Sequence, residues 1–287
     1  QIMRAVGIIL AGGNNNKMRE LTQRRAVAAM PIAGSYRAID FALSNMSNSH
    51  IQKVAVLTQY NARSLNEHLN SSKWWDFGRK QGGLYVFTPT ITADNGYWYR
   101  GTADAIYQNL EFLKRCHEPY VIITSGDAVY KMDYNKLLEY HINKQADITV
   151  VCKEMSADVN TDRFGTIRMN EESRIEEFEE TPVVARSNTI SGGVYVIRRR
   201  KLIELIEKAE AEALERERIR IAAEEAAKAQ ARVEAETRQV MQQAESYARE
   251  REAAVRKEEQ EAAQKQMQQK QQELEQQTYL RMQKQMQ

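Results

Sequence analysis

The chain has 287 residues and a net charge of +2, from 41 Lys and Arg against 39 Asp and Glu, so it has room for one sizeable domain and a further segment. This balance provides no basic stripe for nucleic acid, no apolar run approaches the ~20 residues of a membrane helix, and the first residues show no signal-peptide pattern. Cys116 and Cys152 lie far apart, which indicates free thiols in a reducing compartment, and we expect a cytoplasmic protein without nucleic-acid or membrane partners.

The first predicted element is a buried strand followed by a glycine turn. Val6–Leu10 is a short apolar run, typical of a strand in a parallel sheet. Gly12 and Gly13 follow it and would let backbone N–H groups approach phosphate oxygens. A basic stretch comes next, with Lys17, Arg19, Arg24 and Arg25. An ordinary strand-to-loop turn would show the same pattern, so the turn alone does not establish a phosphate site.

Further along, apolar strand-like runs alternate with amphipathic helical runs as far as residue 197. The expected strands are Val6–Leu10, Lys53–Thr58, Tyr120–Thr124, Ile148–Cys152, Gly165–Arg168 and Gly193–Ile197, and the expected helices are Ala38–Asn48, Ala62–Leu69, Thr102–Cys116 and Tyr134–Gln145. This alternation predicts a three-layer α/β domain over residues 1–197, around a mainly parallel sheet. Ligands in such sheets bind at the carboxyl ends of strands, where the Gly12-Gly13 turn and Ser125-Gly126-Asp127 both fall.

Residues 198–287 have a different composition, rich in Ala, Glu, Gln, Arg, Lys and Met, and contain no Gly or Pro. These are good helix formers, so we expect one long charged helix of about 135 Å at ~1.5 Å per residue. A heptad track runs through Ile219, Ala226, Val233, Val240, Tyr247 and Ala254, but an eleven-residue track fits about as well, which leaves the supercoil hand open. The segment is either a solvated helix, a loose self-associating coiled coil, or a partly disordered Glu/Gln-rich tail.

Motifs in the first two thirds of the chain resemble one family in their order. They include Leu10-Ala11-Gly12-Gly13, Arg25-Ala26, Gly34-Ser35-Tyr36-Arg37-Ala38-Ile39-Asp40-Phe41, Leu57-Thr58-Gln59-Tyr60, Tyr99-Arg100-Gly101-Thr102-Ala103-Asp104, Ser125-Gly126-Asp127, Phe178-Glu179-Glu180 and Ser191-Gly192-Gly193-Val194-Tyr195. This series resembles the sugar-phosphate nucleotidyltransferases and, more narrowly, bacterial glucose-1-phosphate adenylyltransferase (ADP-glucose pyrophosphorylase). The resemblance covers residues ~5–206 and implies a Rossmann-like nucleotidyltransferase domain, here truncated and followed by a helical tail that does not match the family.

The resemblance also implies a reaction, in which glucose 1-phosphate attacks ATP to give ADP-glucose and pyrophosphate for glycogen synthesis. Catalysis would depend on positioning and on charge neutralisation by Mg²⁺ and cationic side chains. By resemblance, Gly12, Gly13, Gln59, Gly101 and Thr102 would bind the nucleotide. Glu180 and Ser191 would bind the sugar, and Lys17 and Asp127 would be the catalytic residues, with Asp127 as the Mg²⁺ ligand. Taken singly, Asp127 could equally cap a turn and Gln59 could be an ordinary surface residue.

Several positions depart from the family pattern where charge matters. A family glycine is Asn15 and a family arginine is Lys17, which keeps the charge but loses the planar two-point fork. Val27 and Ala28 replace a lysine and a proline, Thr181 replaces a second lysine, and nothing in the tail matches the family's second metal-binding aspartate. One lost electrostatic contact to the transferring group costs ~10²–10³ in rate, so this pattern indicates little turnover.

Three functions remain open from the sequence. The first is a regulatory, catalytically weak or silent subunit of glucose-1-phosphate adenylyltransferase, which would form a hetero-oligomer with a catalytic subunit and bind ATP or ADP-glucose and glucose 1-phosphate. The second is an active nucleotidyltransferase that makes ADP-glucose. The third is a helical interaction protein in which the α/β domain is a passenger.

Overall fold

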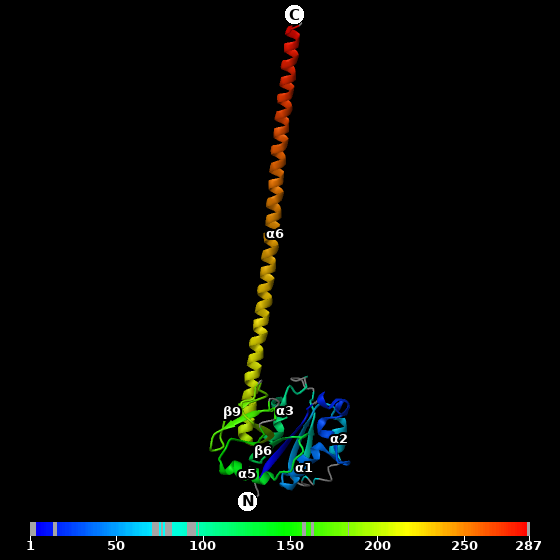
Figure 1. The fold of residues 1–287 in the computed structure, drawn as a ribbon, viewed down its shortest axis with the longest axis vertical. Helices are drawn as coiled ribbons and strands as arrows, with labels where there is room; N and C mark the ends of the chain where they lie inside the picture. Colours follow the sequence, from blue (N-terminus) through cyan, green and yellow to red (C-terminus); the bar gives the residue numbers. More distant parts are fainter. Residues whose placement is uncertain are drawn as a thin grey trace. The chain divides into compact units, whose positions relative to one another are not determined.

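The computed structural model describes residues 4–13, 16–70, 75, 77, 82–90, 96, 98–156, 159–161, 164–182 and 184–285. Its elements in chain order (Figure 1) are β1 (Ala5–Ala11), η1 (Asn16–Thr22), η2 (Val27–Ala29), β2 (Pro31–Ile32), β3 (Tyr36–Arg37), α1 (Ala38–Asn48), β4 (Lys53–Thr58), α2 (Arg63–Asn70), β5 (Gly83–Phe87), α3 (Thr102–Gln108), α4 (Leu110–Lys114), β6 (Tyr120–Ser125), α5 (Tyr134–Asn143), β7 (Ile148–Glu154), β8 (Thr166–Met169), β9 (Ile175–Glu179), β10 (Thr189–Arg198) and α6 (Arg199–Gln285). Compact packing divides these residues into one unit through Ala213 and a second from Leu214 onward. The first turns of α6 therefore pack with the α/β unit, while the predicted domain division at residue 197 stays a prediction.

Within the described residues, one mixed sheet of eight strands organises the first unit, in the order β5-β4-β1-β6-β10-β8-β9, with β7 also pairing β10. Strands β5, β4, β1 and β6 are parallel, and β10 joins β6 antiparallel. The parallel register aligns Leu10 of β1 with Leu57 of β4 and Ser125 of β6. Because these strands end at the same edge, the loops that follow them gather on one side of the sheet.

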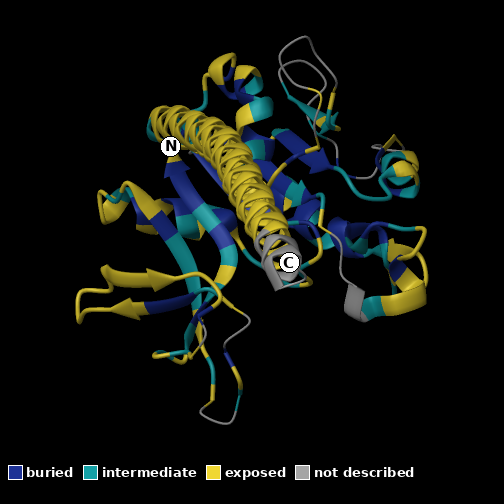
Figure 2. Ribbon diagram, turned by 90° about the horizontal axis from the view of Figure 1, so that it is seen from above, coloured by how far each residue is buried: buried dark blue, intermediate teal, exposed yellow. Residues whose placement is uncertain are grey.

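Alternating side chains along the strands bury both faces of the sheet. On β1, Ile9 belongs to a core cluster with residues of α1, α2 and α5, whereas Val6 and Ile8 belong to a second cluster with residues of α3, α4 and the start of α6. Figure 2 shows this buried sheet in dark blue between its helices. The expected three-layer α/β arrangement and mostly parallel sheet are thus present, with the antiparallel strands added through β10.

One predicted helix is wrong in detail, because residues 102–116 form α3 and α4 rather than a single helix. The break is at Asn109, whose backbone leaves the helical region (φ −112°, ψ 20°). Its side chain donates to the Ala105 carbonyl at 2.8 Å and to the Tyr99 hydroxyl at 2.9 Å. An Asn that bonds nearby backbone competes with the regular helix ladder, which explains the break.

The long C-terminal helix is present as α6, an element of 87 residues. Leu202 and Ile206 are buried against the sheet, whereas the described side chains from residue 214 to 276 are exposed. Coiled-coil pairing of α6 stays a prediction. Among the described residues, none of the helices combines the length and hydrophobicity that a membrane crossing requires.

A buried histidine makes the stability of this fold depend on pH. His141 of α5 is 1% exposed, its Nδ1 lies 2.7 Å from Thr149 Oγ1, and its Nε2 has no partner among the described residues. Burial, with a smaller contribution from Arg198, lowers the pKa of His141 below the ordinary value of a histidine, against an opposing effect of Asp147. The unfolded chain therefore takes up this proton more readily than the folded chain.

We predict that the free energy of unfolding decreases as the pH drops below about 6.5, which is the pKa of His141 in the unfolded chain, toward the lower pKa of His141 in the folded chain. Urea unfolding at about pH 7.5 and about pH 5.5 measures the change, and a His141→Gln variant should lose part of the decrease because it cannot titrate. His117, which is exposed, provides the matched control, since His117→Gln should retain the wild-type pH dependence. An equal pH dependence in wild type and His141→Gln would contradict the prediction.

Candidate functional site

The loops at the carboxyl edge of the parallel strands enclose a cavity of about 640 Å³. Its lining contains residues after β1, after β4, at the start of α3, after β6, after β9 and in β10: Leu10, Ala11, Gly12, Gly13, Val27, Ala28, Leu57, Gln59, Tyr99, Gly101, Thr102, Ala105, Ser125, Asp127, Glu180, Gly193 and Tyr195. Segments far apart in sequence thus meet where the topology of a parallel sheet places a ligand.

The floor of the cavity is formed by two turns in close contact. Gly126 N donates to the Leu10 carbonyl at 2.9 Å, which ties the turn after β6 to the end of β1. A Cβ atom at Gly126 would lie 3.2 Å from Ala11 Cβ and 3.3 Å from Ala28 Cβ. A Cβ atom at Gly12 would lie 3.1 Å from Gln59 Cβ. These positions favour glycine, because a side chain there would push the neighbouring loops apart by a few tenths of an ångström.

Asp127 is exposed at this floor and lines the cavity. Ser125 Oγ donates a hydrogen bond to Asp127 Oδ1, which orients the carboxylate. Within the described part of the chain, no cluster of three His, Cys, Asp or Glu side chains is arranged to hold a metal. Mg²⁺ that is held by one protein carboxylate takes its other ligands from substrate phosphates and water.

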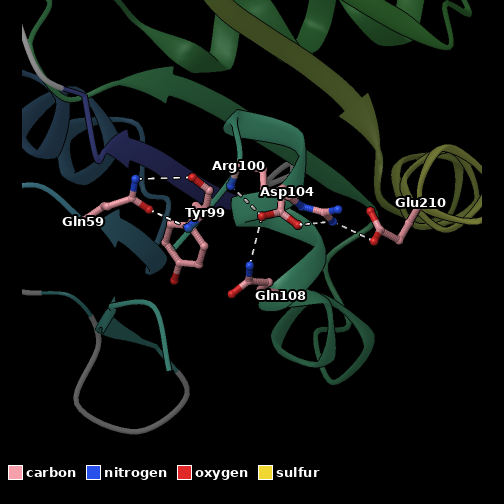
Figure 3. Close-up of polar contacts among 6 residues, drawn as sticks. All are labelled: Gln59, Tyr99, Arg100, Asp104, Gln108 and Glu210. Carbon is pink, nitrogen blue, oxygen red and sulfur yellow. Dashed lines mark hydrogen bonds and ion pairs between the residues drawn. The ribbon is translucent and has the colours of Figure 1, made fainter. Parts of the chain in front are cut away.

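Gln59 and the segment from Tyr99 form one wall. The Gln59 side chain accepts from Tyr99 N at 2.7 Å and donates to Tyr99 O at 3.3 Å, as Figure 3 shows. This paired contact fixes the backbone just before Gly101 and Thr102, which line the cavity. Gln59 is therefore a structural support of the wall as well as part of its surface.

The opposite wall comes from Glu180 and β10. Glu180 lines the cavity, as do Gly193 and Tyr195. The pairing of β10 with β7 shifts register between Ser191 and Tyr195, and Gly193 has φ +69° at this irregularity, a conformation that favours glycine. Ser191 Oγ lies 3.1 Å from the Tyr195 hydroxyl and accepts from Gly193 N at 3.2 Å. Ser191 thus lies beside the cavity and holds residues that line it.

Two of the residues that depart from the family pattern line the cavity. Val27 and Ala28 of η2 line the cavity with apolar side chains. Thr181 follows Glu180 and has φ +43°, which is a genuine outlier for a β-branched residue. Backbone outliers of this type concentrate at functional sites. Lys17 lies in η1, but its side chain, like the whole of Asn15, lies outside the described residues.

The described lining of the cavity has an unusual charge for a phosphate site. Its described lining contains the carboxylates Asp127 and Glu180 and no Lys or Arg. Arg100 is adjacent to the lining residue Gly101, but its guanidinium bonds to Asp104 and Glu210. The predicted site residues other than Lys17 and Ser191 therefore meet in one cavity whose described surface offers backbone amides and carboxylates.

Sequence reasoning assigned no role to several lining residues. Tyr195, Gly193, Tyr99 and Ser125 line the cavity or orient its groups. Tyr195 and Ser125 stand next to motif residues that were assigned roles, so their position in those motifs was the available signal. The contact of Tyr99 with Gln59 is made by backbone atoms, which every residue has, so the sequence does not indicate this contact.

A glycine turn and a carboxylate loop at the carboxyl edge of parallel strands define an α/β protein with a ligand site at that edge. Comparison with known proteins narrows this class: the nucleotidyl transferase family model matches residues 6–241. The chain belongs to the nucleotidyl transferase family.

Three relatives that are similar to this chain share one name. The chain is 42% identical over 208 residues to a glucose-1-phosphate adenylyltransferase of Clostridium novyi (strain NT), with 72% of this chain and 54% of the relative covered. It is 45% identical over 202 residues to that of Bacillus cytotoxicus, with 70% and 54% covered, and 44% identical over 207 residues to that of Bacillus anthracis, with 72% and 55% covered. The chain spans about half the length of the curated relatives it matches.

Proposed function

We propose that this chain is a regulatory, catalytically weak subunit of a glucose-1-phosphate adenylyltransferase, whose cavity binds ATP or ADP-glucose and glucose 1-phosphate. One observation carries the proposal: the cavity joins the glycine turn, Asp127 and Glu180, yet its described lining has Val27 and Ala28 and no cation. Phosphoryl transfer catalysis rests on positioning and on cationic stabilisation of developing charge. A cavity whose described lining offers hydrogen-bonding groups but no cation favours binding over turnover.

Different residues of the chain bind different parts of the ligands. Backbone N–H groups after β1 approach the phosphates, because Gly12 and Gly13 remove side chains there. Glu180 accepts hydrogen bonds from sugar hydroxyls. Asp127, oriented by Ser125, would hold Mg²⁺, which would neutralise part of the phosphate charge. The regulatory effect would be exerted on a catalytic subunit through a shared interface.

We predict that Mg²⁺ and ATP together raise the thermal unfolding temperature, because a ligand that binds only the folded state adds about 2.7 kcal/mol at 100 times its Kd. Asp127→Asn should lose the Mg²⁺-dependent part of this shift. Differential scanning fluorimetry with ATP in MgCl₂ or in EDTA measures both parts.

Asp133→Asn is the matched control, since Asp133 lies outside the cavity lining and caps α5 by accepting from Asn135 N at 3.0 Å. Asn is an equally good cap, so this variant should keep the whole ligand shift. If none of the three ligands ATP, ADP-glucose and glucose 1-phosphate shifts the unfolding temperature, the proposed binding function is wrong.

A further inference from the structure

Helix α6 makes a polar contact with the wall of the cavity. Glu210 Oε1 accepts from Arg100 Nη2 at 2.7 Å, a bond between residues far apart in sequence. The same Arg100 nitrogen donates to Asp104 Oδ1 at 2.9 Å. Asp104 Oδ2 accepts from Arg100 N at 2.7 Å and from Gln108 Nε2 at 2.9 Å. Figure 3 shows this chain of contacts from α6 through Arg100 to α3.

These contacts fix one end of a short cavity-lining segment. Gln59 fixes the backbone of Tyr99, and Asp104 fixes the backbone of Arg100. Gly101 and Thr102 follow directly and line the cavity. The segment that forms this wall is therefore held from β4 on one side and from α3 and α6 on the other.

The contact is better shielded than an ordinary surface ion pair. The Arg100 side chain is 59% exposed, but those of Asp104 and Glu210 are only 9% and 23% exposed. Partial burial raises the pKa of Asp104, but the hydrogen bonds from Arg100 outweigh it and hold that pKa below its usual value. The two carboxylates also raise the pKa of Arg100. The Arg100 guanidinium is thus shared by two carboxylates from different elements.

We infer that Glu210 is a positioning residue, through which the first turns of α6 fix the segment 99–102 and thereby set the nucleotide affinity of the cavity. The effect on affinity rests on the proposed nucleotide site, whereas the positioning of the segment does not. Because Glu210 bonds Arg100 and not the cavity lining itself, it acts through Arg100.

The test compares two single substitutions on α6. Glu210→Ala removes the contact to Arg100. Glu207→Ala, one turn earlier, removes the ion pair with Lys114 Nζ of α4 at 3.0 Å, and neither Glu207 nor Lys114 lines the cavity. Alanine preserves the helix at both positions, so the two variants differ only in which side-chain contact of α6 is removed.

Amide hydrogen exchange of the full chain without ligand is the first measurement. Glu210→Ala should raise exchange about twofold to fivefold at the amides of Tyr99, Arg100 and Ala105, as expected for loss of a partly exposed ion pair, and Glu207→Ala should leave it unchanged. High salt should reduce the difference between wild type and Glu210→Ala, because salt screens the pair. Equal exchange at these amides in Glu210→Ala and wild type would overturn the inference.

The second measurement is the Kd for ATP with MgCl₂ by isothermal titration calorimetry. Glu210→Ala should weaken binding about twofold to fivefold, whereas Glu207→Ala should not. An equal Kd in Glu210→Ala and wild type would refute the link from positioning to affinity. If the wild-type chain binds no ATP, the proposed function fails, and the exchange measurement still decides whether Glu210 positions the segment.

Discussion

The purified chain, supplied with ATP, glucose 1-phosphate and Mg²⁺, should release pyrophosphate at least ~10²–10³-fold more slowly than a full-length relative such as the Bacillus anthracis glucose-1-phosphate adenylyltransferase. The physical reason is the absence of cations from the described lining of the cavity, where Val27 and Ala28 present apolar groups. Each preorganised donor to the developing charge is worth about 3–4 kcal/mol. A coupled pyrophosphate assay of both proteins in parallel measures the ratio.

Restoring one cation should recover part of the rate. Val27→Lys places an ammonium on the same cavity surface as the glycine turn and Asp127, and we expect about a 10-fold gain, less than the full value of a preorganised donor. Val27→Met is the matched control, because it extends an unbranched side chain of similar length without charge. Wild-type turnover close to that of the relative, or an equal gain in Val27→Met, would show that missing charge does not limit this chain.

The subunit hypothesis also predicts an effect of this chain on a catalytic partner. A regulatory subunit changes the affinity or turnover of its partner through differential contacts with the partner's states. Adding this chain to a catalytic subunit should therefore change the ATP or glucose 1-phosphate dependence of the mixture although the chain alone contributes little pyrophosphate.

Much of the fold could be predicted because buried strands carry a strong local pattern. Lys53–Thr58 and Ala38–Asn48 were predicted with the bounds that the structure shows. Strands β5 and β9 were missed. Every residue of β9 is exposed, so no apolar face marks it, and β5 is a short edge strand of partly exposed residues. Strand β9 forms because β8 offers backbone partners, which local sequence does not record. The run Leu84-Tyr85-Val86-Phe87 of β5 does carry a local strand signal, which the expected elements did not include.

The site was harder to predict than the fold, for a reason of topology. Family order identified Gly12, Asp127 and Glu180, but only the strand order and parallel register place them in one cavity. The contact between Arg100 and Glu210 depends on how the first turns of α6 pack against the rest of the domain, so no local motif encodes it. Tertiary contacts between residues this far apart follow from the assembled fold.

The largest expected loss of stability comes from the strand that supports the site. Ile9 of β1 is fully buried, pairs in register with Val56 of β4 and Thr124 of β6, and belongs to the core cluster shared with α1, α2 and α5. It directly precedes Leu10, which lines the cavity. Truncation to alanine removes packed methyl groups from between the sheet and the helices on this face, and the cavity that remains is destabilising because a close-packed core relaxes only partly.

We predict that Ile9→Ala lowers the free energy of unfolding by about 3–4 kcal/mol and the unfolding temperature by about 10 °C. Far-ultraviolet circular dichroism would be dominated by α6, so urea unfolding should be followed by tryptophan fluorescence, to which the buried Trp75 contributes. Val184→Ala is the control, because Val184 is 73% exposed and surface truncations change stability by less than ~0.5 kcal/mol. A loss below about 1 kcal/mol in Ile9→Ala, or an equal loss in Val184→Ala, would mean that β1 does not anchor the core on which the cavity is built.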